Sequence, residues 1–187
     1  MAVPAARTRA DAVRNRALVI AAAAEVFAEK GEAALVPEIA ARAGVGKGTV
    51  YRCFPTKDHL VAAVAIERAR WFEREARAAA ADPDPWAAFA AFMTRLAEAH
   101  CRDRGMLFSM SQGLDLPDLL EARAAAHDAL RELMDRAIAA GAMRADAEPG
   151  DLKLLLRGVA SSLAGADERD PAVWRRYAAL VVNAFRA

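Results

Sequence analysis

The sequence predicts an all-α fold of about nine helices, in which a small N-terminal head precedes a larger helical body. Alanine dominates the composition, Leu, Glu and Arg follow it, and aromatic residues make up only 6 % of the 187 residues. These are the residue types that favour helices over strands. Apolar residues recur in steps of three or four, and no segment alternates as a half-buried strand does. With 56 % apolar residues, the chain can bury a sizeable core.

Glycine and proline residues set the expected limits of the head helices. Gly31 ends the first helix, Pro37 suits the first turn of the second, and Gly44 ends that helix. The third helix has to end before Pro55, because proline disfavours the helical conformation at the residue that precedes it. Residues 1–10 are small, polar and interrupted by proline, which predicts a flexible basic arm.

The body is expected to begin with a long helix that Thr56 caps. Asp82-Pro83-Asp84-Pro85 ends this helix, and further Gly and Pro residues separate the later ones. The predicted helices cover residues 11–30, 37–43, 46–54, 57–81, 85–101, 103–112, 117–140, 150–165 and 171–186. We therefore divide the chain into an arm (1–10), a head (11–56) and a body (57–187).

Two interpretations compete for the stretch AGVGKGTVYRCF at residues 43–54. A phosphate-binding loop would need a glycine where Ala41 stands, and a buried strand before the loop. The preceding PEIAARA carries charges on a helical pattern, which excludes that strand. A helix-turn-helix needs a small residue at the helix crossing, a glycine in the turn and an apolar inner face. Ala40, Gly44, Val50 and Phe54 meet those needs, so the pattern favours a DNA-binding head.

The motif as a whole supports the same interpretation. VFAEKG followed by PEIAARAGVGKGTVYRCFPTKDHLVAAV, within residues 15–64, resembles the DNA-binding domain of the TetR-like (tetracycline-repressor) family of bacterial transcription regulators. The resemblance implies that the third helix lies in the major groove and that the two glycines allow close approach. The residues that it implicates in DNA binding are Gly46, Lys47, Gly48, Thr49, Tyr51, Arg52 and Lys57. Ala34-Leu35-Val36 departs from the family pattern, because it lacks the hydroxyl residue that often caps the second helix.

Charge is unevenly distributed along the chain. Residues 1–60 carry nine Lys or Arg against six Asp or Glu, whereas the rest carries 17 against 19. Arg7, Arg9, Arg14 and Arg16 either follow the DNA as an arm or form a solvated charged tail. Cys53 is either a small tolerated side chain or a redox-sensitive thiol at the DNA surface.

Two wide apolar stripes near the C-terminus predict a dimer interface. Their arc exceeds the apolar face that one surface helix needs, although core packing alone is the other explanation. Members of the resembled family dimerise through their last two helices, and a two-fold dimer would read a palindromic operator. The expected interface residues are Leu152, Leu155, Leu156, Val159, Leu163, Val173, Tyr177, Leu180 and Val181.

The middle of the body is the expected place of an effector pocket, again by resemblance to the family. An aromatic and methionine stripe at helical spacing lies there, which is as typical of a core as of a pocket. The candidate lining residues are Trp86, Phe89, Phe92, Met93, Met106, Phe108 and Met110. His100 and His127 stand alone in sequence, so we expect no metal site. No catalytic constellation or cofactor motif is present, and we expect the protein not to be an enzyme.

These observations together predict a homodimeric transcription regulator, a repressor that an apolar small molecule releases from its operator. The absence of an 18-residue apolar run and of a signal peptide favours a cytoplasmic protein that does not enter a membrane. The alternative is a helical ligand-binding or scaffold protein whose DNA-binding head is vestigial. The missing cap hydroxyl and the net charge of only +1 favour that alternative.

Overall fold

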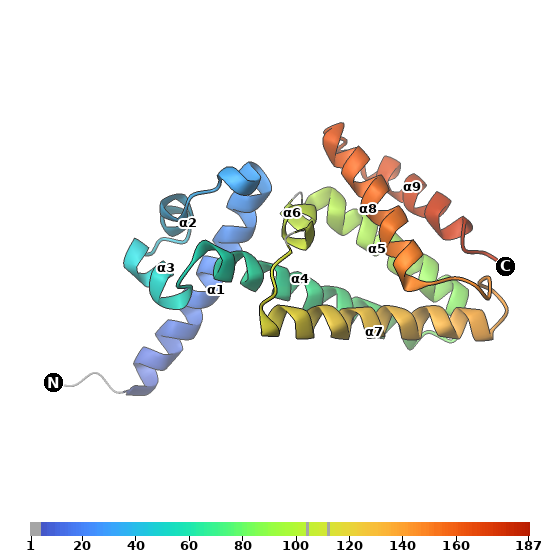
Figure 1. The fold of residues 1–187 in the computed structure, drawn as a ribbon, viewed down its shortest axis with the longest axis horizontal. Coiled ribbons are helices and arrows are strands. Elements are labelled where there is room, and N and C mark those ends of the chain that lie inside the picture. The colour runs from blue at the N-terminus through green and yellow to red at the C-terminus, as the bar shows by residue number, and fades with distance from the viewer. Residues whose placement is uncertain (1–4, 104, 112) are drawn as a thin grey trace.

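A computed structural model describes residues 5–103, 105–111 and 113–187. It describes the side chains of all of these except residues 5–9 and 109–111. The predicted all-α fold is confirmed: these residues form nine α-helices and one 3-10 helix, and no strand occurs among them. In Figure 1 the head lies at the N-terminal end and the body at the other. The helices are α1 (Ala5–Lys30), α2 (Val36–Arg42), α3 (Lys47–Cys53), α4 (Lys57–Ala80), α5 (Pro85–Arg102), α6 (Gly105–Ser111), α7 (Pro117–Ala139), α8 (Pro149–Gly165) and α9 (Pro171–Asn183), and the 3-10 helix is Gly31–Ala33.

The helix limits differ most from the prediction at the N-terminus. α1 begins at Ala5, not at Asp11, so the backbone of residues 5–10 continues the helix instead of forming a separate arm. No proline follows Pro4 in this stretch, and alanine is the strongest helix former, which accounts for the difference. Residues 1–4 of the expected arm lie outside the described residues.

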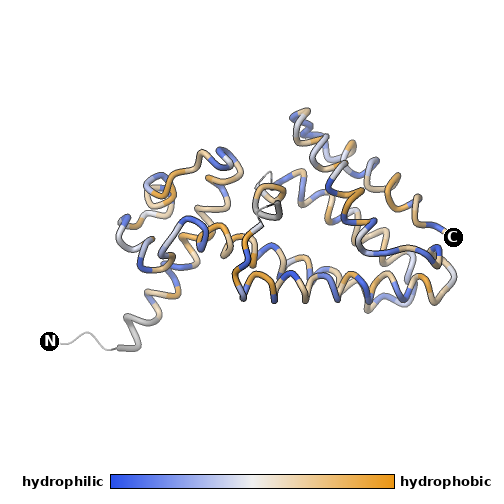
Figure 2. Tube along the Cα trace, viewed as in Figure 1, coloured by the Kyte–Doolittle hydropathy of each residue, from blue (hydrophilic) through white to orange (hydrophobic). Residues whose placement is uncertain are grey.

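α4 belongs to the cores of both the head and the body. Leu60, Val61 and Val64 are buried in the head cluster together with Phe27, Ile39, Val50 and Phe54. Farther along α4, Ala76 and Ala79 are buried in the body cluster. Figure 2 shows that α4 is almost continuously hydrophobic where it passes between the two parts, which agrees with the sequence LVAAVAI at residues 60–66.

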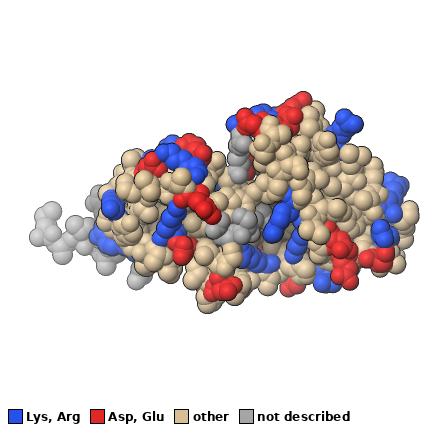
Figure 3. All heavy atoms as spheres, turned by 45° about the horizontal axis from the view of Figure 1, so that its top comes forward, with Lys and Arg blue, Asp and Glu red and all other residues tan. Residues whose placement is uncertain are grey.

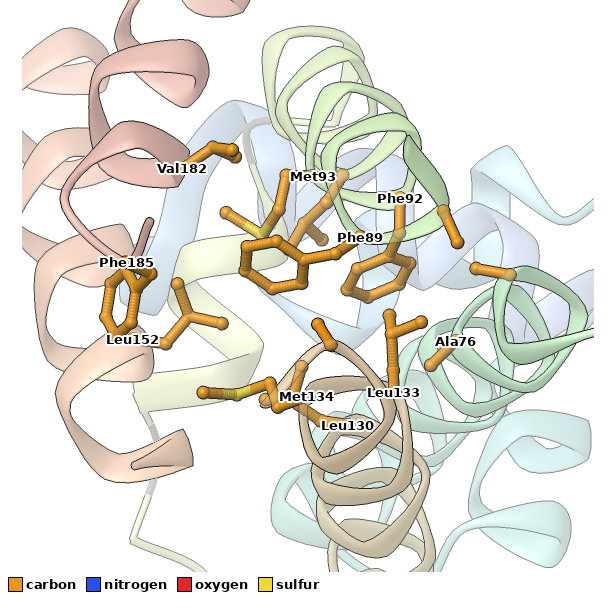
Figure 4. Packing of buried hydrophobic residues seen from close by; sticks show 14 of the residues in the cluster. Ala76, Phe89, Phe92, Met93, Leu130, Leu133, Met134, Leu152, Val182 and Phe185 are labelled. Atoms are coloured by element: carbon orange, nitrogen blue, oxygen red, sulfur yellow. The ribbon is translucent and has the colours of Figure 1, made fainter. Parts of the chain in front are cut away.

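The body is a helical bundle in which α4 and α7 run side by side and α5 packs against α9 (Figure 1). Its core is the cluster seen in Figure 4, where Phe89, Phe92 and Met93 of α5 point toward Leu133 and Met134 of α7. Each of these five side chains is fully buried. Phe92 also meets Phe72 of α4 edge to face, with ring centroids 5.0 Å apart.

A partly buried ion pair holds α6 at the junction of head and body. Arg68 of α4 donates to both carboxylate oxygens of Asp103 at 2.9 and 2.7 Å, and to the carbonyl of Gly105 at 2.6 Å. Burial lowers the pKa of Arg68, and Asp103 opposes that shift. Gly105 packs so closely that an added Cβ would lie 2.9 Å from the backbone nitrogen of Ala28 in α1. The start of α6 is therefore fixed between α4 and α1.

Candidate DNA-binding surface and effector cavity

The turn between α2 and α3 is built on Gly44, which has a φ of +67°. Its N–H donates to the carbonyl of Ala41 at 3.2 Å, and the N–H of Val45 donates to that of Ala40 at 3.0 Å. Such bonds close the end of a helix, and the left-handed conformation favours glycine there. GVGKGT thus forms a turn and the start of α3, not the loop after a strand.

Ion pairs fix α2 against α1. Arg42 contacts Glu25 at 2.9 Å and Glu29 at 3.0 Å, and its hydrogen bond lowers the pKa of Glu29. Glu38 accepts from Lys30 at 2.5 Å and from the backbone N–H of Leu35 at 3.1 Å. The Glu38 carboxylate thus satisfies the backbone N–H of the cap residue Leu35, which is a different donor from the one that a cap hydroxyl would bind.

The predicted DNA-binding residues of α3 lie on its outer face. Val50 is 1 % exposed and turned into the head, whereas Tyr51 is 42 % exposed. Lys47 lies over the Tyr51 ring, with its Nζ 5.7 Å from the centroid. Arg52 donates to the hydroxyl of half-buried Thr49 at 3.1 Å. Two cations and two hydroxyl groups therefore lie along one short helix.

Gly46 and Gly48 border this face and are exposed. A Cβ at either position would meet nothing within 4 Å inside the protein. The fold itself thus gives no steric reason for glycine at these two positions. A surface that approaches from outside would supply one.

Three residues outside α3 make intramolecular contacts near it. Lys57, at the start of α4, donates to the carbonyl of Glu32 at 2.6 Å, while Thr56 caps α4 by accepting from the N–H of His59 at 3.3 Å. Arg16 lies 4.5 Å from the centroid of the Phe54 ring and donates to the Cys53 carbonyl at 3.4 Å. Arg16 thus stabilises the end of α3.

The other three arginines of the expected arm differ from Arg16. Arg14 is exposed on α1, and the side chains of Arg7 and Arg9 lie outside the described ones. In the view of Figure 3, positive and negative side chains are interspersed over the head. On this face of the head, the described side chains therefore form no broad basic surface.

The body contains a cavity of about 400 Å³ between α4, α5, α6, α7 and α8. A second, wider groove of about 580 Å³ lies between α1, α4 and α5 and is more open to solvent. The residues that line the 400 Å³ cavity are Ala65, Arg68, Ala69, Phe72, Leu96, His100, Met106, Leu107, Phe108, Arg123, Ala126, His127, Leu130, Lys153, Leu156, Arg157 and Ser161. We call this space the body cavity.

Of the residues predicted for the pocket, Met106 and Phe108 line the body cavity. Phe89, Phe92 and Met93 are instead fully buried in the core, as Figure 4 shows. Trp86 packs against the same core and stacks with Arg186, whose guanidinium carbon is 5.1 Å from the ring centroid. The Met110 side chain lies outside the described ones. The cavity wall that the prediction missed comes mainly from α4, α7 and α8, together with Leu96 and His100 of α5 and Leu107 of α6.

The polar groups of the body cavity are cationic or neutral. Nζ of Lys153 lies 2.5 Å from Nδ1 of His127. Burial lowers the pKa of both groups, and their mutual proximity lowers that of His127 further. Burial also lowers the pKa of His100 to about 4, so this imidazole is neutral at pH 7. Among the described residues, Nδ1 of His100 is buried without a hydrogen-bond partner.

The residues predicted for the dimer interface divide into three groups. Leu152 and Val181 are buried in the body core, and Leu156 lines the body cavity. Val159, Leu163 and Val173 are half-buried. The residues that expose an apolar face on α8 and α9 are Leu155, Tyr177 and Leu180, together with Leu154, which is 72 % exposed.

Neither a metal site nor a membrane span is found in the part of the chain that the structure describes. No three His, Cys, Asp or Glu residues are grouped there as metal ligands. No described helix combines the length and the apolar character needed to cross a membrane.

The head consists of three helices, and a turn at Gly44 joins two short ones, α2 and α3. This head on a larger helical body is the architecture of a helix-turn-helix transcription regulator. Residues 19–64 match the family described as bacterial regulatory proteins, tetR family, and residues 84–187 match the C-terminal domain of SbtR-like transcriptional regulators. The chain therefore belongs to the TetR family of bacterial transcription regulators, which confirms the resemblance found in the sequence. No curated protein matches it closely enough to count as a relative.

Solved structures agree with this assignment. A TetR transcriptional regulator from Streptomyces coelicolor is 32 % identical, with 91 % of this chain and 98 % of that one covered and a TM-score of 0.67. A TetR regulatory protein from Mycobacterium vanbaalenii is 36 % identical, with 96 % and 99 % covered and a TM-score of 0.62. FadR from Bacillus subtilis, solved in complex with stearoyl-CoA, is 18 % identical, with 88 % of this chain and 96 % of that one covered. Its TM-score of 0.70 shows that the two proteins share the fold.

Proposed function

We propose that this TetR-family protein is a cytoplasmic homodimeric repressor that binds a palindromic operator through α3. The outward face of α3 carries this proposal, because it combines Lys47, Tyr51 and Arg52 with glycines that no internal contact requires. Lysine and tyrosine suit phosphate contacts, and arginine suits a guanine edge. Gly46, Thr49 and Lys57 complete the proposed surface, with Lys57 exchanging its bond to the Glu32 carbonyl for a phosphate.

The exposed apolar face of α8 and α9 supports the proposed dimer. Tyr177 is 41 % and Leu180 55 % exposed, and Leu155 extends the same face. Apolar side chains that are grouped in this way mark an interaction site on a monomer. A two-fold dimer through this face would set two copies of α3 about one DNA turn (~34 Å) or somewhat more apart.

Release of the operator would start at α6, which touches both the body cavity and the head. Phe108 lines the cavity and stands 5.6 Å from the Phe27 ring of α1, measured between centroids. A ligand that favours a shifted α6 would therefore bias the position of α1 and of the head. Its effect on operator affinity equals its differential affinity for the two arrangements, commonly ~1–3 kcal/mol.

The test is binding of the purified protein to DNA from upstream of its own coding region, measured by fluorescence anisotropy at several salt concentrations. We expect tight binding that a scrambled competitor does not displace and that weakens steeply with salt. Lys47→Ala should weaken binding and reduce the salt slope by about one. Arg52→Ala should also weaken it, whereas Arg74→Ala, at an exposed position of α4, should not.

Failure of the binding test has a defined meaning. Selection from random DNA covers the case in which the operator lies elsewhere. If selection also yields no sequence that is bound more tightly than scrambled DNA, the repressor proposal is wrong. The function would then be that of a helical ligand-binding or scaffold protein with a vestigial head.

A further inference from the structure

The lining of the body cavity has one sign of charge. Arg68, Arg123, Lys153 and Arg157 are among its lining residues, and none of those residues is Asp or Glu. Asp103 already neutralises Arg68, and Arg123 donates to the Leu114 carbonyl at 3.5 Å. The bond to a neutral carbonyl leaves the positive charge of Arg123 in place. Two further cations, Lys153 and Arg157, lie on α8, where both are exposed at the edge of the cavity.

Lys153 and Arg157 are one helical turn apart, and so are adjacent on one side of α8. Within the described ranges, Arg157 makes no hydrogen bond or ion pair, and the close neighbour of Lys153 is the His127 imidazole rather than a carboxylate. Arg131 adds a further positive charge beside this pair and lowers both pKa values, while Asp128 is the acidic neighbour that opposes the shift. An anion bound here would relieve that repulsion.

The remaining wall of the body cavity is apolar. Phe72, Leu96, Leu130 and Leu156 contribute large apolar side chains from four different helices. His100 adds one neutral polar group, whose buried Nδ1 is without a partner among the described residues. A volume of about 400 Å³ is at the small end of ligand pockets, so a small molecule fits better than a large conjugate.

We propose that the body cavity binds a small amphipathic carboxylate, with its anionic group between Lys153 and Arg157 and its apolar chain or ring against Phe72, Leu96 and Leu130. The His100 imidazole bonds a neutral polar group of the ligand. This inference rests on the proposed function, in which the cavity holds the effector, but replaces the expected apolar effector with an organic anion. A lipophilic cation is disfavoured, because the cavity offers it no carboxylate partner.

The experiment measures binding to the full-length protein by calorimetry with two matched sets of probes. One set is decanoate, decan-1-ol and decylamine, and the other is 4-phenylbutyrate, 4-phenylbutan-1-ol and 4-phenylbutylamine. In at least one set we expect the carboxylate to bind at least tenfold more tightly than its alcohol and amine, and to lose affinity as salt rises. Decyl phosphate, compared with decanoate, shows whether the site prefers a carboxylate to a phosphate.

Variants locate the anion. Lys153→Met keeps most of the aliphatic length and should weaken carboxylate binding about tenfold without changing alcohol binding. Lys30→Met, in the head, is the matched control and should change neither. The proposal is overturned if, in both sets, the amine or the alcohol binds as tightly as the carboxylate. It is also overturned if decyl phosphate binds more tightly than decanoate, if Lys153→Met has no effect, or if no carboxylate binds. Because these measurements contain no DNA, their failure is distinguishable from failure of the operator assay.

Discussion

Gly48→Ala should make the protein more stable and a worse DNA binder at the same time. Gly48 is the second residue of α3, it is exposed, and an added Cβ meets nothing within 4 Å. Replacing such a glycine restricts the unfolded chain and raises the free energy of unfolding by about 0.4–1 kcal/mol. For a chain of this length, that corresponds to a rise in Tm of roughly 1–4 °C at fixed protein concentration.

The same methyl group should obstruct the approach of α3 to DNA. A tenfold loss of affinity at one half-site corresponds to ~1.4 kcal/mol of binding free energy. Because a two-fold dimer loses this amount at both half-sites, Kd should become about 100-fold weaker. Thermal unfolding and fluorescence anisotropy measure the two effects separately. Gly150→Ala is the matched control, because Gly150 is also the exposed second residue of its helix, α8. Unchanged operator affinity of Gly48→Ala would refute the placement of this glycine at the DNA surface.

Three further predictions concern the junction and the cavity. Because burial lowers the pKa of His100 to about 4, below the unfolded value of 6.5, stability falls as the pH drops through this window. Between pH 7 and pH 5, the free energy of unfolding of His100→Gln should therefore fall by about 2 kcal/mol less than that of the unaltered protein, as measured by urea unfolding. Gly105→Ala should lower the free energy of unfolding by ~1–3 kcal/mol, because the added Cβ overpacks against α1. Gly113→Ala should leave it unchanged, because a Cβ there has open space, and equal unfolding midpoints of the two variants would contradict this. Asp103→Asn should lower the free energy of unfolding by about 1–3 kcal/mol, since it removes the carboxylate charge that two Arg68 hydrogen bonds meet, and an unchanged Tm would count against it.

Most of the fold could be predicted because proline and glycine mark the helix ends. α5, α7 and α9 each begin at a proline, as expected from the fixed φ of that residue, and Gly44 ends α2. α8 also begins at a proline, Pro149, one residue before the predicted start. The start of α1 could not be fixed in this way, since the alanines around residues 5–10 are compatible with a helix or a tail. Helix propensity then decides the outcome, and no local signal marks the boundary.

The α3 surface was more predictable than the cavity for a physical reason. Periodicity shows which side of a helix is buried, but a side chain against a core and one against a cavity have the same pattern. Phe89 and Phe92 therefore resemble pocket residues in sequence and yet fill the core. Lys153 and Arg157 were missed because both are exposed, as charged residues on an amphipathic helix normally are, and only the packing of α8 near α7 shows that they also border the cavity.

The shared helix α4 determines where relatives of this protein can exchange parts. Leu60, Val61 and Val64 belong to the head core, and residues from Trp71 onward pack against the body core. Between them, Ala62 and Ala65 form a small cluster with Leu119 of α7. A recombination point at residue 56 would separate Leu60 and Val61 from the side chains they pack with. A chimera joined between Val64 and Arg68 would keep Leu60, Val61 and Val64 with the buried residues of the head cluster. The small cluster of Ala62 and Leu119 would then contain side chains from both parents, and Phe108 would pack against the head cluster of the other parent. Operator choice and ligand choice can then be combined from different family members with a single crossover inside one helix.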